Sequence, residues 1–382
     1  MRRKIINSFI LIILFLAPTS LCNNEDTIKE QKNSFGINSF ISNSKKYIGE
    51  SFLEENDVNQ IFETAIKGQV DNKTLLNRLV NLFGKEIKST LGAISSILAI
   101  IVIHSILKSI SESLENDNIS KLIYYVQYIL IATIVMANFS EIIKLTKDSI
   151  TNMIGFINML VPILTSLMLF TGSITTTSML EPTIIFAVNL MGNIIQDIIL
   201  PIVLVMASFS IISKLSDKVQ IDKLAKFLKS SVVWFLGIIL TIFVSVISLE
   251  GTLSSSVDGV TAKTTKAVVS SAIPIVGKIL GDAVDSILGC GIILKNAVGI
   301  VGVVIIIGIC VVPILKLAML SITYKALAGV CQPIADTKIL QLLEQIGDIF
   351  KILLAILSSV AVLTIIGITL VIKISNSGMM YR

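Results

Sequence analysis

Long uncharged runs are the feature that most limits what this chain can fold into. Five runs have the length of a membrane-spanning helix: 89–107, 122–140, 230–249, 296–315 and 352–372. A helix of about 20 residues crosses the roughly 30 Å of hydrocarbon in a bilayer. Only 15% of all residues are charged, against roughly 25% in soluble domains. The sequence therefore predicts an all-α polytopic membrane protein.

Residues 1–22 have the pattern of a secretory signal peptide. Its three parts are Arg2-Arg3-Lys4, the apolar stretch from Ile5 to Ala17, and the small-x-small site Ser20-Leu21-Cys22. An uncleaved anchor is the alternative, but this apolar stretch rises only about 20 Å as a helix. A lipoprotein acylated at Cys22 is a minor alternative, because Leu21 stands where a small residue is preferred. We expect the mature chain to begin at Asn23.

Residues 23–88 have the composition of a water-soluble segment, and we expect this segment to be exported and helical. Apolar residues recur in it at helical spacing: Val58, Ile61, Phe62 and Ile66, then Leu75, Leu76, Leu79, Val80 and Phe83. Such an apolar face could bind a partner protein. Packing onto the membrane domain is the commoner explanation, and we favour it.

The rest of the chain divides into a predicted two-helix hairpin, 89–148, and two predicted repeats, 149–261 and 262–382. Pro162 and Pro274 are 112 residues apart, and so are Pro201 and Pro313. The residues around them match in character, which favours an internal duplication. With so few prolines, a coincidence of spacing stays open. Each repeat would contain a proline-bent half-helix or re-entrant hairpin.

Export of Asn23 sets the predicted orientation. Crossing at 89–107, returning at 122–140, dipping at 149–180 and crossing at 182–213 leaves Lys214–Lys229 in the cytoplasm. That stretch holds five lysines, as the positive-inside rule prefers. The result is six spans with an outside carboxyl terminus, or eight if both hairpins cross fully.

The sequence offers little that could perform catalysis. It contains one histidine, His104, which we expect to be a satisfied imidazole near the end of the first spanning run. It has no phosphate loop, no HExxH and no GxSxG, and its four cysteines lack metal-site spacing. No basic block has the interleaved aromatics that stack on nucleic acid. We predict a non-enzyme without cofactor or metal that binds no nucleic acid.

Ionisable residues at membrane depth are the candidate functional positions, because they are costly there. Asp197 interrupts an apolar run and could face a polar cavity, or it could lie in a short surface turn. Asp282 and Asp285 share one helix face with Lys278; a solvated face or an ion path would explain them. Lys295 is a further candidate for lining a cavity or an interface.

The carboxyl-terminal half resembles the stage III sporulation protein AE family of endospore-forming bacteria. The resemblance rests on Ala272-Ile-Pro-Ile-Val-Gly277, Gly281-Asp-Ala-Val-Asp285, Leu294-Lys-Asn-Ala-Val-Gly299, Val312-Pro313-Ile-Leu-Lys316, and Tyr324-Lys-Ala-Leu-Ala followed by Gln332-Pro333. The signal peptide, the short exported segment and the lysine-rich stretch before Ser230 are also similar. The family has no established catalytic residues to carry over.

The resemblance implies a subunit of a channel or secretion-like complex that crosses the two membranes between mother cell and forespore. It implies a location in the mother-cell membrane around the forespore. The implied partners are membrane and ring proteins of the same operon, a secretion-type ATPase and a forespore-side partner, besides membrane lipids. Two alternatives remain: a secondary transporter of a small solute, and a structural anchor for ring components.

Overall fold

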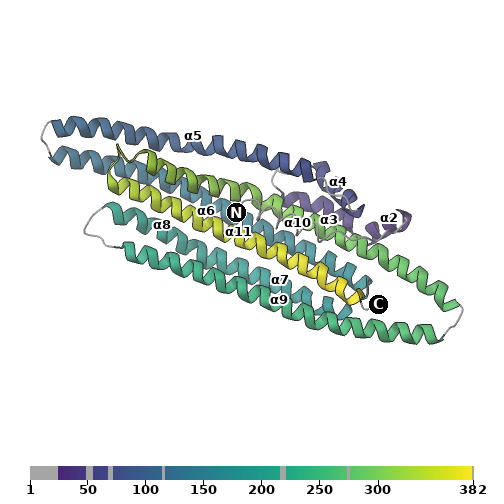
Figure 1. The fold of residues 1–382 in the computed structure, drawn as a ribbon. Coiled ribbons are helices and arrows are strands. Elements are labelled where there is room, and N and C mark those ends of the chain that lie inside the picture. The colour runs from purple at the N-terminus through teal and green to yellow at the C-terminus, as the bar shows by residue number, and fades with distance from the viewer. Residues whose placement is uncertain are drawn as a thin grey trace.

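The computed structural model describes residues 25–48, 55–67, 72–113, 117–215, 221–272 and 276–380. All regular structure in these residues is helical. Six long helical rods pack side by side into an elongated bundle, and three short helices lie against one part of it (Figure 1). Among the described residues, five helices are long and apolar enough to cross a membrane. The fold is therefore that expected of a multi-pass membrane protein.

The short helices come first in the chain: α2 (Glu25–Ser34), α3 (Ile37–Ser44), the single 3-10 turn η1 (Lys45–Tyr47) and α4 (Glu55–Ile66). The long rods follow: α5 (Asn72–Ser113), α6 (Asp117–Phe170), α7 (Ile174–Ile194) continued by the π-helical turn η2 (Ile195–Ile199) and α8 (Leu200–Leu215), then α9 (Asp222–Ala272), α10 (Val276–Val330) and α11 (Thr337–Met380). Successive rods run in opposite directions, so the described chain passes along the bundle six times.

A glycine ends α6 and turns the chain into α7. Gly172 has φ 85°, a left-handed conformation that residues with a side chain adopt only at a cost. The Ser173 amide donates to the Met168 carbonyl at 2.9 Å and the Gly172 amide to the Leu169 carbonyl at 3.0 Å. These bonds satisfy carbonyls that the end of a helix leaves open. The turn reverses the chain at residues 171–173.

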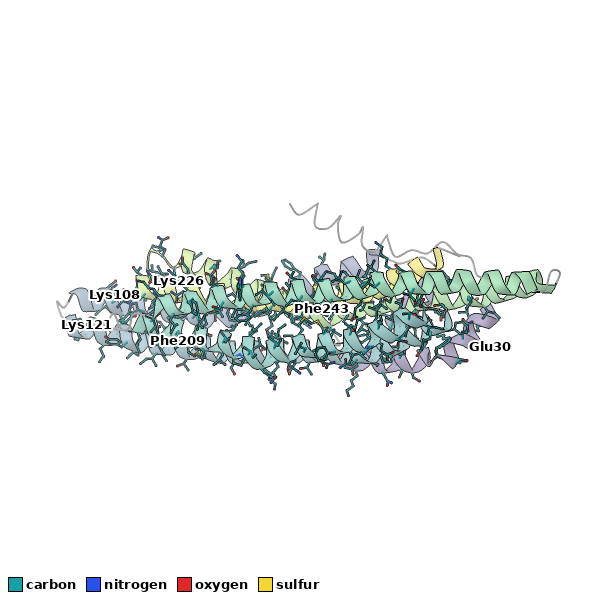
Figure 2. The ribbon with its side chains drawn as sticks, turned by 90° about the horizontal axis from the view of Figure 1, so that it is seen from below. Glu30, Lys108, Lys121, Phe209, Lys226 and Phe243 are labelled. Carbon is teal, nitrogen blue, oxygen red and sulfur yellow. The ribbon has the colours of Figure 1, made fainter. Side chains whose placement is uncertain are left out.

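Lysines gather at the end of the bundle where α5, α8 and α10 end and α6, α9 and α11 begin. We call this the lysine-rich end; its lysines include Lys108, Lys121, Lys214, Lys226 and Lys338. Figure 2 shows Lys108, Lys121 and Lys226 there, Phe243 midway and Glu30 toward the other end. The described residues of Lys214–Lys229, the stretch that the sequence predicts to be cytoplasmic, thus lie at the same end as Lys108, Lys121 and Lys338.

Contacts at two glycines place the apolar runs of α9, α10 and α11 at the same level of the bundle. A Cβ added to Gly299 of α10 would lie 2.0 Å from the Ile372 Cδ1 atom of α11. A Cβ added to Gly367 of α11 would lie 3.7 Å from the Phe243 ring of α9. The runs 230–249, 296–315 and 352–372 therefore overlap along the bundle axis, as helices that share one bilayer must.

The same reasoning places the second half of α6 at this level. A Cβ added to Gly302 of α10 would lie 2.6 Å from the Leu160 Cδ2 atom, and the Lys316 ammonium pairs with the Glu141 carboxylate at 2.8 Å. Residues 141–160 of α6 therefore lie beside the apolar run of α10.

The predicted dip of the chain at 149–180 is absent from this fully described region. Residues 149–170 are the second half of one continuous helix, which includes Pro162, and only the turn at Gly172 interrupts the chain before α7. Helices in membranes tolerate proline because neighbouring helices and hydroxyl side chains satisfy the freed backbone groups. The carbonyl that Pro162 leaves without its helical donor is that of Asn158. The Thr165 and Ser166 hydroxyls make additional hydrogen bonds to the Pro162 carbonyl.

The apolar stretch of α5 lies nearer the lysine-rich end than those of the other rods. Among the described residues this stretch is Ser95–Ile110, and its His104 contacts Asp336 in the α10–α11 connection. Farther back, Leu82 packs against Val311 of α10, so polar residues of α5 lie beside the apolar run of α10. The helix continues through the predicted boundary at residue 88, and the division into domains stays a prediction.

The short helices pack their apolar face onto the bundle, as the sequence predicts. Val58 and Phe62 of α4 are buried, and the Phe35 ring meets the Phe170 ring of α6 at 5.2 Å between centroids. The second predicted group behaves differently, because Val80 and Phe83 of α5 are exposed. The signal peptide lies outside the described residues.

The internal repeat stays a prediction. Pro201, in the first turn of α8, and Pro313, inside α10, both lie in rods that run toward the lysine-rich end. Each rod carries a lysine after its proline, Lys214 in α8 and Lys325 in α10. Pro274 lies outside the described residues, so the surroundings of Pro162 and Pro274 are not compared.

Candidate functional site

Asp197 lies on the surface of the bundle, in the π-helical turn η2 between α7 and α8. Its side chain is exposed, and the turn belongs to a rod long and apolar enough to span a membrane. A π-helical turn shifts the face that a helix presents and is frequent at functional sites. The structure thus puts Asp197 on the outside of the single chain, neither in a surface loop nor in an internal cavity.

The other predicted site residues all belong to α10. Lys278, Asp282 and Asp285 share one helical stretch, so the shared face inferred from their spacing has its helix; their side chains lie outside the described part of the structure. Lys295, with 0% of its surface exposed, is buried within the bundle. Lys295 and Asp197 therefore lie in different environments, one inside the bundle and one on its surface.

Near the lysine-rich end, one carboxylate joins three rods. Asp348 of α11 accepts from the Lys229 ammonium of α9 at 2.9 Å and from the Lys325 ammonium of α10 at 2.5 Å. A shallow pocket opens beside it, lined by Met206, Ser210, Ala225, Lys226, Lys229, Gln345, Asp348 and Ile349. The three charged side chains are 39–44% exposed. The cluster therefore faces water and fixes the relative positions of α9, α10 and α11.

A second carboxylate attaches α5 to the rest of the bundle. Asp336, directly before α11, contacts the His104 Nε2 atom at 2.9 Å and the Lys108 ammonium at 2.5 Å. The His104 side chain is 1% exposed. The expectation that the histidine is a satisfied imidazole is met at one ring nitrogen only: Nε2 pairs with a structural carboxylate, whereas Nδ1 is buried with no hydrogen-bond partner among the described residues.

A third carboxylate caps α7 from another helix. Asp258 of α9, which is 6% exposed, accepts from the Thr175 amide at 2.8 Å and from the Thr176 amide at 2.9 Å. The first amides of a helix have no partner within it and carry partial positive charge, so a carboxylate is favourable there. This contact holds α7 against α9 at the end away from the lysines.

These carboxylates build structure and do not assemble a reactive centre. Among the described residues, no group of three or more His, Cys, Asp or Glu side chains could hold a metal ion. The imidazole of His104 interacts with Asp336 and lies near Lys108, as part of the contact that attaches α5 to the α10–α11 connection. The arrangement can hold helices in register and present charge, and it suits an assembly component.

Sequence reasoning missed Asp258, Asp336 and Asp348. Each is an isolated carboxylate between helices that are far apart in the chain, so no spacing pattern identifies it. A partial signal existed for Asp348, because it lies in an amphipathic stretch that follows a lysine-rich segment. The partner helix, however, follows only from the tertiary structure.

The comparisons with known proteins agree with the resemblance carried by the motifs. The family model described as stage III sporulation protein AE matches residues 56–375. The stage III sporulation protein AE of Bacillus subtilis (strain 168) is 28% identical over 307 residues, which cover 80% of this chain and 77% of that relative. No solved structure matches the chain. Because the family model matches well over half of the sequence, the chain belongs to the stage III sporulation protein AE family.

Proposed function

We propose that this chain is a non-enzymatic membrane subunit of a trans-envelope channel or secretion-like complex that links mother cell and forespore. Family membership implies a role at stage III of sporulation, and the family is not known as an enzyme. The multi-pass helical bundle suits a membrane subunit. The proposed location is the mother-cell membrane around the forespore, with the mature amino terminus exported.

The observation that carries this proposal is the contrast between the two ends of the bundle. One end carries the lysines and is the proposed cytoplasmic end, where a secretion-type ATPase could dock. At the other end α9 and α10 project beyond the other rods (Figure 1). Beyond Asp258, which contacts the first turn of α7, α9 continues to Ala272, a rise of roughly 21 Å. A projecting helical hairpin offers an exported surface to the ring components of the same operon.

The secondary-transporter alternative has less support. A transporter binds its solute at the bilayer midplane inside the protein. Asp197, the residue that suggested this reading, is exposed on the outside of the chain. In the structural-anchor alternative, the chain would use the same two ends of the bundle to bind its partners. It would differ from the proposed function only in that the complex would conduct no solute through this subunit.

Purification from sporulating cells tests the proposal. A tagged chain should co-purify with the membrane and ring proteins of its operon, as identified by mass spectrometry, and the chain alone should move no solute in liposomes. Transport by the purified chain, lost in Asp197→Asn, would overturn the proposal in favour of a transporter.

The orientation has its own test. Single cysteines replace Lys226 at the lysine-rich end and Gly259 and Ser377 at the other end. An impermeant thiol reagent added from outside should label only the last two, because the positive-inside rule puts Lys226 in the cytoplasm. Labelling at Lys226 from outside would reverse the proposed orientation.

A further inference from the structure

The outer surface of α6 is polar over a length in which a lipid-facing helix would be apolar. Between Leu130 and Leu169 no large hydrophobic residue of α6 is exposed. From residue 140 to residue 152 every exposed position of α6 carries a polar or charged side chain, whereas apolar residues such as Ile143 and Leu145 are half-buried against the bundle. We define the polar strip as Glu141, Lys144, Lys147, Asp148, Thr151 and Asn152 of α6 together with Gln196 and Asp197 of η2.

The two parts of the strip lie side by side. The Thr151 hydroxyl donates to the Gln196 side-chain oxygen at 3.5 Å. One turn away, a Cβ added to Gly192 of α7 would lie 2.0 Å from the Ile154 Cδ1 atom, so the two helices are in close contact. The exposed carboxylate of Asp197 therefore extends the polar surface of α6 onto the next rod.

The strip lies at membrane depth. It begins at the Glu141–Lys316 ion pair, and Lys316 follows the last residue of the apolar run 296–315 of α10. It ends before Leu160, which meets Gly302 within that run. From Glu141 to Thr151 the helix rises about 15 Å, half the thickness of the hydrocarbon layer.

Charges in this position are not satisfied within the chain. Lys144, Lys147, Asp148 and Asp197 form no ion pair in the described part of the structure. A lysine near the edge of the bilayer can extend its long side chain back to the interface. The short carboxylates of Asp148 and Asp197 cannot do so, and irregular or charged groups at this depth need protein or a water-filled cavity around them.

We infer that the polar strip forms one wall of a water-filled passage at membrane depth, a step that rests on the proposed channel function. Further chains of the complex supply the remaining walls, since the strip lies on the outside of this chain. Three carboxylates, Glu141, Asp148 and Asp197, and two lysines, Lys144 and Lys147, belong to it, so the wall carries both signs of charge. Such a wall suits small hydrophilic solutes and ions without strong charge selection.

Thiol accessibility in the assembled complex tests this inference. Single cysteines replace Asp148, Thr151 and Asp197, and Ile242 on the exposed apolar side of α9 serves as the matched position. Membranes from sporulating cells are treated with a charged, membrane-impermeant methanethiosulfonate. The unsubstituted chain, whose free cysteines Cys310 and Cys331 are buried, sets the background.

The three strip cysteines should react at least about tenfold faster than the cysteine at position 242, because only a hydrated thiol ionises readily. A lipid-soluble maleimide, applied in parallel, shows that each cysteine is present and exposed. If the strip cysteines react no faster with the charged reagent than position 242, the strip faces protein or lipid and the passage is overturned. Co-purification of the operon partners is measured on the same membranes, so loss of the passage and loss of complex membership are told apart.

Discussion

The outer sides of α6 and α9 lie at the same level of the bundle and differ completely in chemistry. Within the run 230–249, α9 exposes large apolar residues: Val233, Trp234, Phe235, Ile242, Val246 and Leu249. Beside the same apolar run of α10, α6 exposes charges and hydroxyls. Both sides cannot face the same solvent. The α9 side is matched to lipid, and the α6 side is matched to water or to polar protein.

The neighbours of each rod follow the same division. On the α6 side lies α5, whose Lys85 and Lys88 are exposed close to Leu82, the residue that packs on α10. The short helices, with polar outer faces, also pack on this side. The difference teaches that hydropathy of a helix as a whole does not tell which of its sides meets lipid.

A lysine introduced on the outer side of α9 or of α6 tests whether the two sides face different solvents. We expect the loss of protein from the membrane with the α9 variant to be the largest effect of all. Ile242→Lys puts an ammonium on the lipid-facing side of α9, which costs about 3 kcal/mol at the centre of a membrane helix. The amount of chain in the membrane, measured by immunoblot, should fall severely. Thr151→Lys, in the polar strip, is the matched variant and should accumulate as the parent does. Equal losses in both variants would show that both sides meet lipid.

The attachment of the polar side to the bundle depends on Asp336. Asp336→Ala leaves the buried His104 imidazole without its carboxylate, which costs about 1–3 kcal/mol. The midpoint of thermal unfolding in detergent should fall accordingly. Lys108→Met keeps the histidine contact and removes only a half-exposed ion pair, so its effect should stay below about 1 kcal/mol. A larger effect from Lys108→Met would mean that charge, and not burial of His104, secures α5.

The apolar side has a smaller attachment of its own at Asp258. Asp258→Ala removes the acceptor of two α7 amides, and loss of such a cap costs about 1 kcal/mol. The same thermal unfolding measurement should show a modest decrease. Asp258→Asn retains one acceptor oxygen and should fall between alanine and the parent. No difference between the alanine variant and the parent would remove this contact from the account of how α7 and α9 are held together.

Much of the fold was predictable because it depends on local pattern. The long apolar helices and the amphipathic face at Val58 and Phe62 follow from composition and spacing. The continuity of α6 was not predicted. Gly155 and Pro162 are residue types that often interrupt a helix, so the sequence suggested a dip there instead. In the structure α6 is continuous through both residues, and the Tyr47 ring of η1 packs against Gly155.

The candidate site was predictable only in part. Asp197 was identified because a carboxylate inside an apolar run is unusual. Asp148 and Thr151 were not identified, because they lie between two apolar stretches and resemble a loop. Their position beside the apolar run 296–315 of α10 becomes visible only in the structure, where α6 is one continuous helix.

The sequence by itself determined that this chain belongs in a membrane, to which family it belongs, and which segments carry the lysines. Hydropathy and motif spacing are local properties of the chain, so they can be read without knowing which helices pack together. The tertiary structure alone decided the register of the rods, because register depends on contacts such as Gly302 with Leu160 between residues far apart in the chain. That register turns an ordinary polar stretch of α6 into a polar surface at membrane depth.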